Sequence, residues 1–389
     1  MKPLVVVGLS GGVDSSVAAW RLLEAGYRVK GVYMKNWEDT EGLRGPKCPF
    51  DTDSEFAEMV ARRLKIEFEI VNLAREYRAR VVEYLFSEYG KGRTPNPDVL
   101  CNREIKFAAF WEVARGMGAE YVATGHYVRK EAFEVGGNTH YRLLAGVDNA
   151  KDQSYFLCQV NQEQLQHALF PLGDMVKTEV RGIARNLGLA TAARKDSYGI
   201  CFVGEVDLPQ FLSQRLAARE GPIIELPPDM APPEHGDSLW QRAQPYTLRP
   251  EMGVEVGRHH GAHFFTIGQR KGINVGGKAQ PLFVVGVDVA SNTLYVAQGH
   301  GHPLLNRQVV LVRREEVHWI DPYCAVDVGT SRRVEARLRY RQPLQGATLH
   351  SEPEGVYLEF DTPQRGVTPG QFAAWYHGAE LLGSGPVSA

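Results

Sequence analysis

The chain has 389 residues, a formal net charge of −2 and 43% hydrophobic residues. This length suits two or three globular domains, and the nearly neutral charge leaves any nucleic-acid site to local basic patches. Five cysteines do not make a disulfide framework in a chain of this size, and no apolar run approaches the ~20 residues that span a bilayer. We therefore expect a cytoplasmic protein with no membrane segment.

The stretch from Leu4 to Ser16 predicts a phosphate-binding turn. Leu4 to Leu9 is a valine-rich apolar run, typical of a buried parallel strand. Ser10 to Gly12 ends this run, and Asp14 to Ser16 favours the start of a helix. A helix N-terminus after a glycine turn presents backbone N–H groups that bind phosphate. The alternative is that the two glycines make an ordinary turn between a strand and a helix. The segment matches neither GxxxxGK[ST] nor GxGxxG, so it is not a phosphate loop of either of those kinds.

Strands alternate with helices through the first third of the chain. Strand patterns occur at Val29–Met34, Phe68–Leu73 and Tyr121–Thr124, with helical patterns between them. This alternation predicts an α/β domain with a doubly wound parallel sheet. Ligands bind at the carboxyl ends of such strands, where the glycine turn, Met34 and Gly125–His126 all fall. We therefore expect a nucleotide pocket at this edge of the sheet.

The segment RTPNPDVLC, residues 93–101, places an acid near a thiol. Pro95 and Pro97 predict an extended or turned path without a helix. Asp98 lies three residues before Cys101, a spacing that allows proton exchange with the thiol or with a substrate. The alternative is an ordinary loop that ends on a buried, inert cysteine.

A second cysteine lies in KDSYGICFVG, residues 195–204. Cys201 stands between two apolar residues and follows a glycine, a pattern that also suits a buried strand. Upstream, KDQSYFL, residues 151–157, combines a charged head with an aromatic tail. Taken alone, its Lys-Asp-Gln start is typical of a solvated turn.

The rest of the chain predicts β structure. Residues 221–258 are rich in proline, as expected of loops or a linker. His263–Ile267 and Pro281–Val289 read as strands, and short strands and turns recur to the end without a helical period. We expect three domains: a doubly wound parallel-sheet domain at 1–218, a small central β-rich domain with a proline-rich insertion at 219–280, and a C-terminal β-barrel at 281–389.

Residues 333–342, RVEARLRYRQ, read as a strand with a basic face. Apolar residues at the even positions alternate with Arg333, Arg337, Arg339 and Arg341. A period of two predicts that these four arginines share one face of the strand. That face is either an ordinary solvated surface or a surface that contacts RNA phosphates.

The loop GLSGGVDSS (8–16) resembles the pyrophosphate loop of the ATP pyrophosphatases, which cleave ATP to AMP and pyrophosphate. Further motifs, in order along nearly the whole chain, resemble one family of that superfamily, the tRNA-specific 2-thiouridylases. These motifs are MKNW (34–37), GRTPNPDVLCNREIKF (92–107), ATGHY (123–127), KDQSYFL (151–157), KDSYGICFVG (195–204), TIGQRKG (266–272), VAQGH (296–300), RYRQ (339–342) and TPGQ (368–371).

The resemblance implies roles for individual residues. The residues implied to bind ATP are Gly8, Leu9, Ser10, Gly11, Gly12, Val13, Asp14, Ser15, Met34 and Gly125. Those implied to receive the target base are Asn96, Pro97 and Asp98, with Asp98 as general acid or base. Those implied to contact tRNA are His126, Lys151, Asp152, Gln153, Arg339, Tyr340 and Gln371.

The implied reaction makes 2-thiouridine at the wobble position of lysine-, glutamate- and glutamine-type tRNAs. ATP, with Mg²⁺ as cofactor, adenylates the C2 oxygen of uridine, and no resident metal site is implied. Cys201 carries sulfur as a persulfide, delivered by a cysteine desulfurase or a sulfur-relay protein. Cys101 either attacks the persulfide to liberate sulfide or forms a disulfide with Cys201 after transfer.

The sequence departs from the family pattern at two places. Tyr198 stands where a small hydroxyl residue is common, and its bulk would crowd the segment of Cys201. The proline-rich stretch at 227–258 is longer than usual. Two other hypotheses remain: a synthetase of the same superfamily that uses ammonia, which the paired cysteines disfavour, and an RNA-binding or iron–sulfur protein whose cysteines ligate a cluster.

Overall fold

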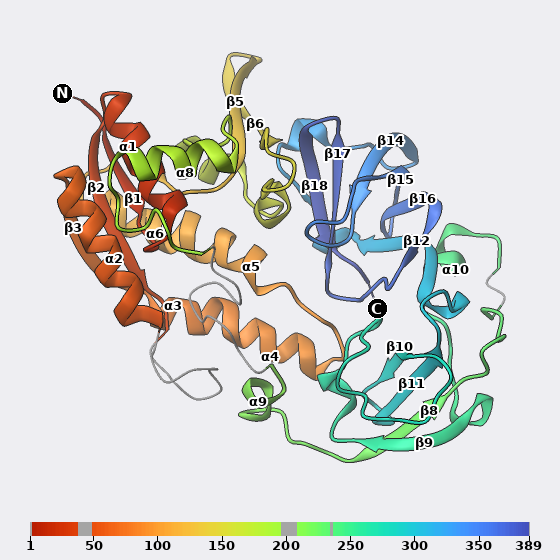
Figure 1. Ribbon diagram of the computed structural model, residues 1–389. Coiled ribbons are helices and arrows are strands. Elements are labelled where there is room, and N and C mark those ends of the chain that lie inside the picture. Colours follow the sequence, from red (N-terminus) through yellow and green to blue (C-terminus); the bar gives the residue numbers. More distant parts are fainter. Residues whose placement is uncertain (1, 38–48, 196–207, 234–235, 389) are drawn as a thin grey trace.

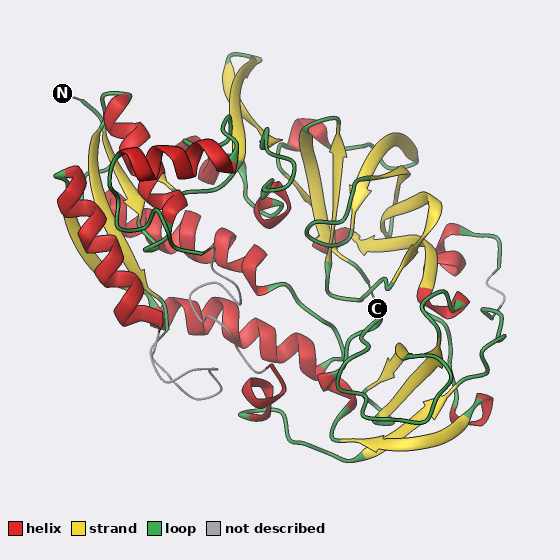
Figure 2. Cartoon of the chain, in the orientation of Figure 1, coloured by secondary structure: helices red, strands yellow, loops and turns green. Residues whose placement is uncertain are grey.

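The computed structural model describes residues 2–37, 49–195, 208–233 and 236–388. Figure 1 shows three bodies along the chain: a first domain with a helix-covered sheet, a small central sheet and a C-terminal sheet. Helices concentrate in the first domain, and strands dominate the other two (Figure 2). The predicted class, an α/β domain followed by β-rich regions, is confirmed.

The first domain is built on a parallel sheet in the order β3-β2-β1-β4-β7. The central strand is almost entirely apolar because it is buried on both faces of the sheet. The strands are β1 (Leu4–Gly8), β2 (Arg28–Lys35), β3 (Glu67–Asn72), β4 (Tyr121–Ala123) and β7 (Ala168–Leu169).

Helices pack on both faces of this sheet, as a doubly wound fold requires. Val5 and Val7 pack in one layer with residues of α1 and α2. Val6 packs in the opposite layer with residues of η1, η2 and α6. The helices are α1 (Val13–Glu24), α2 (Pro49–Leu64), α3 (Ala74–Tyr77), η1 (Arg78–Val82), α4 (Glu83–Gly90), α5 (Pro97–Leu100), η2 (Cys101–Ala109), α6 (Phe110–Gly116), η3 (Ser154–Leu157), α7 (Gln162–His167), α8 (Lys177–Asn186) and α9 (Leu208–Ser213).

The central sheet has the order β10-β11-β8-β9. Its strands are β8 (Gly221–Glu225), β9 (Val254–His259), β10 (Leu282–Asp288) and β11 (Thr293–Gln298), with α10 (Leu239–Ala243), η4 (Pro250–Met252) and η5 (Ala262–Phe264) between them. Strands β10 and β11 follow residue 280 in the chain but pair within this sheet, since β11 pairs in parallel with β8 and antiparallel with β10. The strand expected at His263–Ile267 is instead the short helix η5 and an irregular turn.

The C-terminal sheet is antiparallel and has the order β12-β16-β15-β14-β17-β18-β6-β5, with β13 paired to β18. Two of its strands, β5 (Val128–Val135) and β6 (Asn138–Ala145), form a hairpin that comes from the first domain. The others are β12 (Asn306–Arg313), β13 (His318–Trp319), β14 (Thr330–Arg337), β15 (Gln345–Glu352), β16 (Gly355–Arg365), β17 (Phe372–His377) and β18 (Glu380–Pro386). Short 3-10 turns complete this region: η6 (Pro303–Leu305), η7 (Arg314–Glu316) and η8 (Pro322–Cys324).

The predicted basic face on residues 333–342 is wrong. Strand β14 ends at Arg337, and the next residues bend into a turn in which Arg341 has φ 65°. Arg337 is buried, and Arg333 forms an exposed ion pair with Asp361. The period of two stops where the strand stops, so the four arginines do not share a face.

None of the helices in the described ranges combines the length and the apolar character that crossing a bilayer requires.

Candidate active site

The glycine turn after β1 leads directly into the N-terminus of α1. Gly12 occupies the N-cap position and offers no side chain, so the N–H groups of the first helical turn remain available to an anion. The hydroxyls of Ser15 and Ser16 donate to the Gly12 carbonyl oxygen, at 3.2 and 2.7 Å. Gly11 has φ 71°, and a Cβ there would strike the backbone of Asp53. Only glycine fits this position, because the conformation is left-handed and the space is filled.

Asp14, in the first turn of α1, is held by two side chains. Lys177 Nζ lies 2.8 and 2.7 Å from the two carboxylate oxygens, and the Tyr127 hydroxyl donates to Oδ1 at 2.7 Å. Lys177 is the first residue of α8 and is largely buried. An ammonium group therefore stands beside the turn, where it adds to the positive end of the α1 dipole. Sequence reasoning missed Lys177, because no spacing links it to the turn.

Arg194 ties the turn to α2. Its guanidinium donates to the Gly11 carbonyl oxygen and to Asp53 Oδ1, both at 2.7 Å, and lies 4.4 Å from the ring centroid of Phe56. The anchor is just upstream of Lys195, where the KDSYGICFVG motif begins. Cys201 and Tyr198 lie outside the described residues, as does Cys48.

The other residues implied to bind ATP meet at the same sheet edge. A Cβ on Gly125 would lie 2.7 Å from Ser15 N, so the end of β4 touches the start of α1. A Cβ on Gly8 would lie 2.9 Å from Met34 Cε, so the ends of β1 and β2 are equally close. Met34 therefore lies beside the end of β1, and Gly125 lies beside the start of α1.

Cys101 lies at the junction of two helical segments. Pro97 is the first residue of α5, because proline at this position loses no hydrogen bond. The prediction of no helix after Pro95 is therefore wrong. Asn96 caps α5 by accepting from Asp98 N at 3.1 Å, and Cys101 opens the π-helical segment η2.

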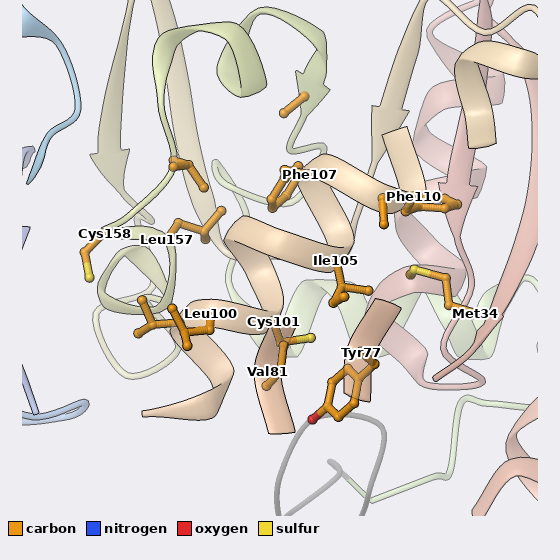
Figure 3. Close-up of a cluster of buried hydrophobic side chains, with 14 of the residues drawn as sticks. Met34, Tyr77, Val81, Leu100, Cys101, Ile105, Phe107, Phe110, Leu157 and Cys158 are labelled. Atoms are coloured by element: carbon orange, nitrogen blue, oxygen red, sulfur yellow. The ribbon is translucent and has the colours of Figure 1, made fainter. Parts of the chain in front are cut away.

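The Cys101 thiol is fully buried. It packs in the layer that also contains Met34 and Tyr77, and Figure 3 shows it among Val81, Leu100 and Ile105. The side chain of Asn102 donates from Nδ2 to the carbonyl oxygens of Asp98 and Phe156, both at 3.0 Å.

The thiols of the other two described cysteines, Cys158 and Cys324, have raised pKa values. Burial raises the pKa of the Cys158 thiol to about 12. Burial, followed by the charges of Glu380 and Asp321, raises the pKa of Cys324 to about 11. Both thiols are therefore protonated and weakly nucleophilic at neutral pH.

All three regions of the chain hold the segment before Asn96. Thr94 N donates to the Pro369 carbonyl oxygen at 2.8 Å, and Gln371 Nε2 donates to the carbonyl oxygens of Thr94 and Pro95 at 2.9 and 3.3 Å. The hydroxyls of Thr94 and Thr266 lie 3.0 Å apart. We call these contacts the three-domain clamp. The Gln371 amide, implied to contact tRNA, binds the backbone that leads to Asp98.

Two further residues implied to contact tRNA are buried. Asp152 accepts from Arg337 Nη2 at 2.5 Å, from Ser154 Oγ at 2.9 Å and from the N–H of Gly146 at 3.2 Å. His126 Nδ1 lies 2.7 Å from Thr124 Oγ1, and burial, assisted by the Lys106 ammonium, holds the pKa of His126 well below its usual range. Both are internal in this state, which their motifs did not reveal.

The remaining residues implied to contact tRNA lie nearer the surface. Lys151 and Gln153 are half-buried, and Gln153 Oε1 accepts from Tyr127 N at 3.0 Å. Arg339 is exposed, and its guanidinium donates to Thr368 Oγ1 at 3.1 Å. Tyr340 packs on Phe156, with 4.2 Å between ring centroids.

Family models match three stretches of the chain. Residues 3–205 match a model described as the tRNA methyl transferase HUP domain. Residues 240–298 match the tRNA methyl transferase PRC-barrel domain, and residues 310–387 match the aminomethyltransferase beta-barrel domain.

Curated relatives match the chain from end to end. Proteins named tRNA-specific 2-thiouridylase MnmA from Christiangramia forsetii and Flavobacterium johnsoniae are each 52% identical over 99% of this chain and 99% of their own length. The protein of that name from Pseudomonas fluorescens is 44% identical over 99% of this chain and 95% of its own. Among solved structures, a 4-thiouridine synthetase–RNA complex with bound ATP is 18% identical with a TM-score of 0.32, covering 55% of this chain and 50% of that one.

Proposed function

The chain belongs to the tRNA-specific 2-thiouridylase family, whose members are tRNA sulfurtransferases, and from that premise we propose that it adenylates the C2 oxygen of a tRNA uridine and then replaces that oxygen with persulfide sulfur. One observation carries this proposal. Met34, whose methyl group approaches Gly8 at the end of β1, shares a buried layer with Cys101. A nucleotide bound at the turn and the sulfur nucleophile Cys101 would therefore both approach the carboxyl edge of the first-domain sheet.

The turn supplies the groups that an ATP phosphate chain needs. The C2 oxygen of uridine attacks the α-phosphorus, and pyrophosphate leaves toward the N-terminus of α1. Lys177, already paired with Asp14, neutralises part of the charge on the leaving pyrophosphate.

Magnesium fits this site as an ion held mainly by the nucleotide. Asp14 offers one carboxylate, and the described ranges contain no cluster of three or more His, Cys, Asp or Glu side chains suited to a metal. One carboxylate with phosphate oxygens and water is a common magnesium environment. The ion would neutralise phosphate charge.

Sulfur transfer needs two thiols. The outer sulfur of a persulfide on Cys201 attacks C2, and AMP leaves. The Cys101 thiolate then attacks the inner sulfur of Cys201, which releases 2-thiouridine and leaves a Cys101–Cys201 disulfide. An external dithiol reduces that disulfide before the next turnover. In the alternative order, Cys101 attacks first and liberates hydrosulfide, which then attacks C2.

The deciding experiment combines purified protein, ATP, unmodified tRNA and a cysteine desulfurase that delivers persulfide. We expect 2-thiouridine, AMP and pyrophosphate in equal amounts. Cys101→Ser and Cys201→Ser should each abolish 2-thiouridine formation, and Cys158→Ser is the matched control that should retain it. After loading, Cys101→Ser should trap extra sulfur mass on the Cys201 peptide.

Three results would contradict the proposal. These are full activity of either serine variant, persulfide mapped to Cys158 or Cys324, or AMP formation that depends on ammonia instead of sulfur. An iron–sulfur chromophore required for activity would instead assign the cysteines to a cluster.

A further inference from the structure

Asn36 is a buried amide without a partner. Its side chain is 1% exposed, and neither Oδ1 nor Nδ2 makes a hydrogen bond. The next residue, Trp37, is also buried, and its indole Nε1 likewise has no acceptor. Burying an amide without partners opposes folding, and such groups are rare in native proteins. These polar atoms therefore require an explanation other than stability.

The place of Asn36 in the fold points to the active site. It directly follows Lys35, the last residue of β2, at the carboxyl end of the parallel sheet. It lies two residues beyond Met34 along the chain. Met34 belongs to the layer that contains Cys101.

Trp37 fixes the backbone at this point. Its ring packs edge-on against Tyr77, with 6.4 Å between centroids, and tilted against Phe211 at 5.7 Å. The ring also lines a pocket of about 420 Å³ with Ala74, Arg75 and Arg78. This packing anchors the backbone directly after Asn36.

We propose that the Asn36 carboxamide binds the hydrogen-bonding edge of a nucleobase during the thiolation reaction, a role that rests on the proposed function. A carboxamide offers one donor beside one acceptor, which matches a base edge bidentately. Adenine presents the N6 amino group beside a ring-nitrogen acceptor. Uracil presents N3–H beside O4, and a contact there leaves O2 open to ATP. The adenine of ATP and the uracil of the target nucleotide in tRNA therefore both present the donor and acceptor pair that the carboxamide binds.

The test uses two variants of the full chain. Asn36→Leu has a similar volume and removes both polar atoms, and Asn36→Asp keeps the shape but loses the donor. Because Asn36→Leu removes an unpaired buried amide, the melting temperature of the ligand-free protein should rise or stay unchanged. Ligand recognition should fall by roughly 5- to 150-fold, the range for one bidentate base contact.

Separate measurements identify the base. ATP affinity is measured by calorimetry without tRNA, and thiolation kcat/KM for tRNA is measured at saturating ATP. Weaker ATP binding in both variants assigns the contact to adenine. Unchanged ATP binding with a lower kcat/KM for tRNA assigns it to uracil.

Unchanged ATP affinity and unchanged kcat/KM for tRNA would overturn the proposal. So would a melting temperature that falls in Asn36→Leu with normal kinetics, because the amide would then be structural. Since wild-type protein is assayed in parallel, failure of the thiolation reaction itself is distinguished from failure of the Asn36 assignment.

Discussion

The buried ion pair between Asp152 and Arg337 offers a sharp test, because motif and structure assign Asp152 different roles. The motif implies that Asp152 contacts tRNA. In the structure the two side chains are 6% and 9% exposed, and Asp152 joins η3 of the first domain to β14 of the C-terminal sheet. Arg337 also donates to the Tyr376 hydroxyl from Nε and Nη2, at 3.1 and 2.9 Å.

Asp152→Asn should destabilise the protein strongly. The substitution keeps the shape of the side chain but leaves the Arg337 guanidinium buried without a counter-charge. Removing one partner of a buried pair costs about 3–5 kcal/mol. For a domain of 150–250 residues, 1 kcal/mol corresponds to about 2–4 °C, so the melting temperature should fall by roughly 6–20 °C. The double variant Asp152→Asn/Arg337→Met removes the orphaned charge and should recover part of this loss.

The assay is thermal unfolding, with tRNA affinity measured well below the melting temperature of each variant. A matched control is Asp361→Asn, which breaks the exposed pair that Arg333 makes from the same strand, and which should change stability little. If Asp152→Asn melts like the wild type and binds tRNA more weakly, the buried-pair reasoning is refuted and the RNA contact is supported.

Three further predictions follow from single contacts. Lys177→Met should slow pyrophosphate release by roughly tenfold or more, because the charged partner of Asp14 is lost, whereas tRNA affinity should not change. Gln371→Ala should lower the rate of single-turnover thiolation and change tRNA affinity by no more than about twofold, because Gln371 binds the backbone before Asp98. Reduced tRNA affinity with a normal thiolation rate would instead show that Gln371 contacts tRNA directly. Burial lowers the pKa of Lys130 from 10.5 to about 8, so the unfolded chain binds this proton more tightly, and the free energy of unfolding should rise with pH between those values. In the Lys130→Met variant, the free energy of unfolding measured by urea denaturation should no longer rise between pH 8 and 10.5. If it rises as in the wild type, other groups cause the rise.

The first domain was predictable because its signals are local and periodic. A valine-rich run, a glycine turn and alternating helices place β1, β2 and β4 in one sheet, and the rule for parallel sheets then brings Met34 and Gly125 to the turn. The position of Pro97 was misjudged for an equally local reason. Proline breaks a helix interior but starts a helix well, and Asn96 supplies the cap.

The contacts that complete the site were not predictable, since each joins distant parts of the chain. Lys177 reaches Asp14, and Gln371 reaches Thr94, with no periodic pattern connecting either pair. The prediction of a basic face on residues 333–342 failed for a related reason. A period of two describes the arginines only while the strand lasts, and Arg337 turns inward to meet Asp152.

The β5–β6 hairpin has a consequence for synthesis on the ribosome. Leu143 and Leu144 of β6 pair with Leu381 and Glu380 of β18, so an early hairpin completes the last sheet to be made. At about 5–20 residues per second, the hairpin waits roughly 10–50 s for its partner strand. During that interval the β6 edge of the hairpin exposes unpaired backbone groups, which can pair with strands of other chains. The nascent protein therefore passes through a window in which translation speed and chaperone access govern its yield.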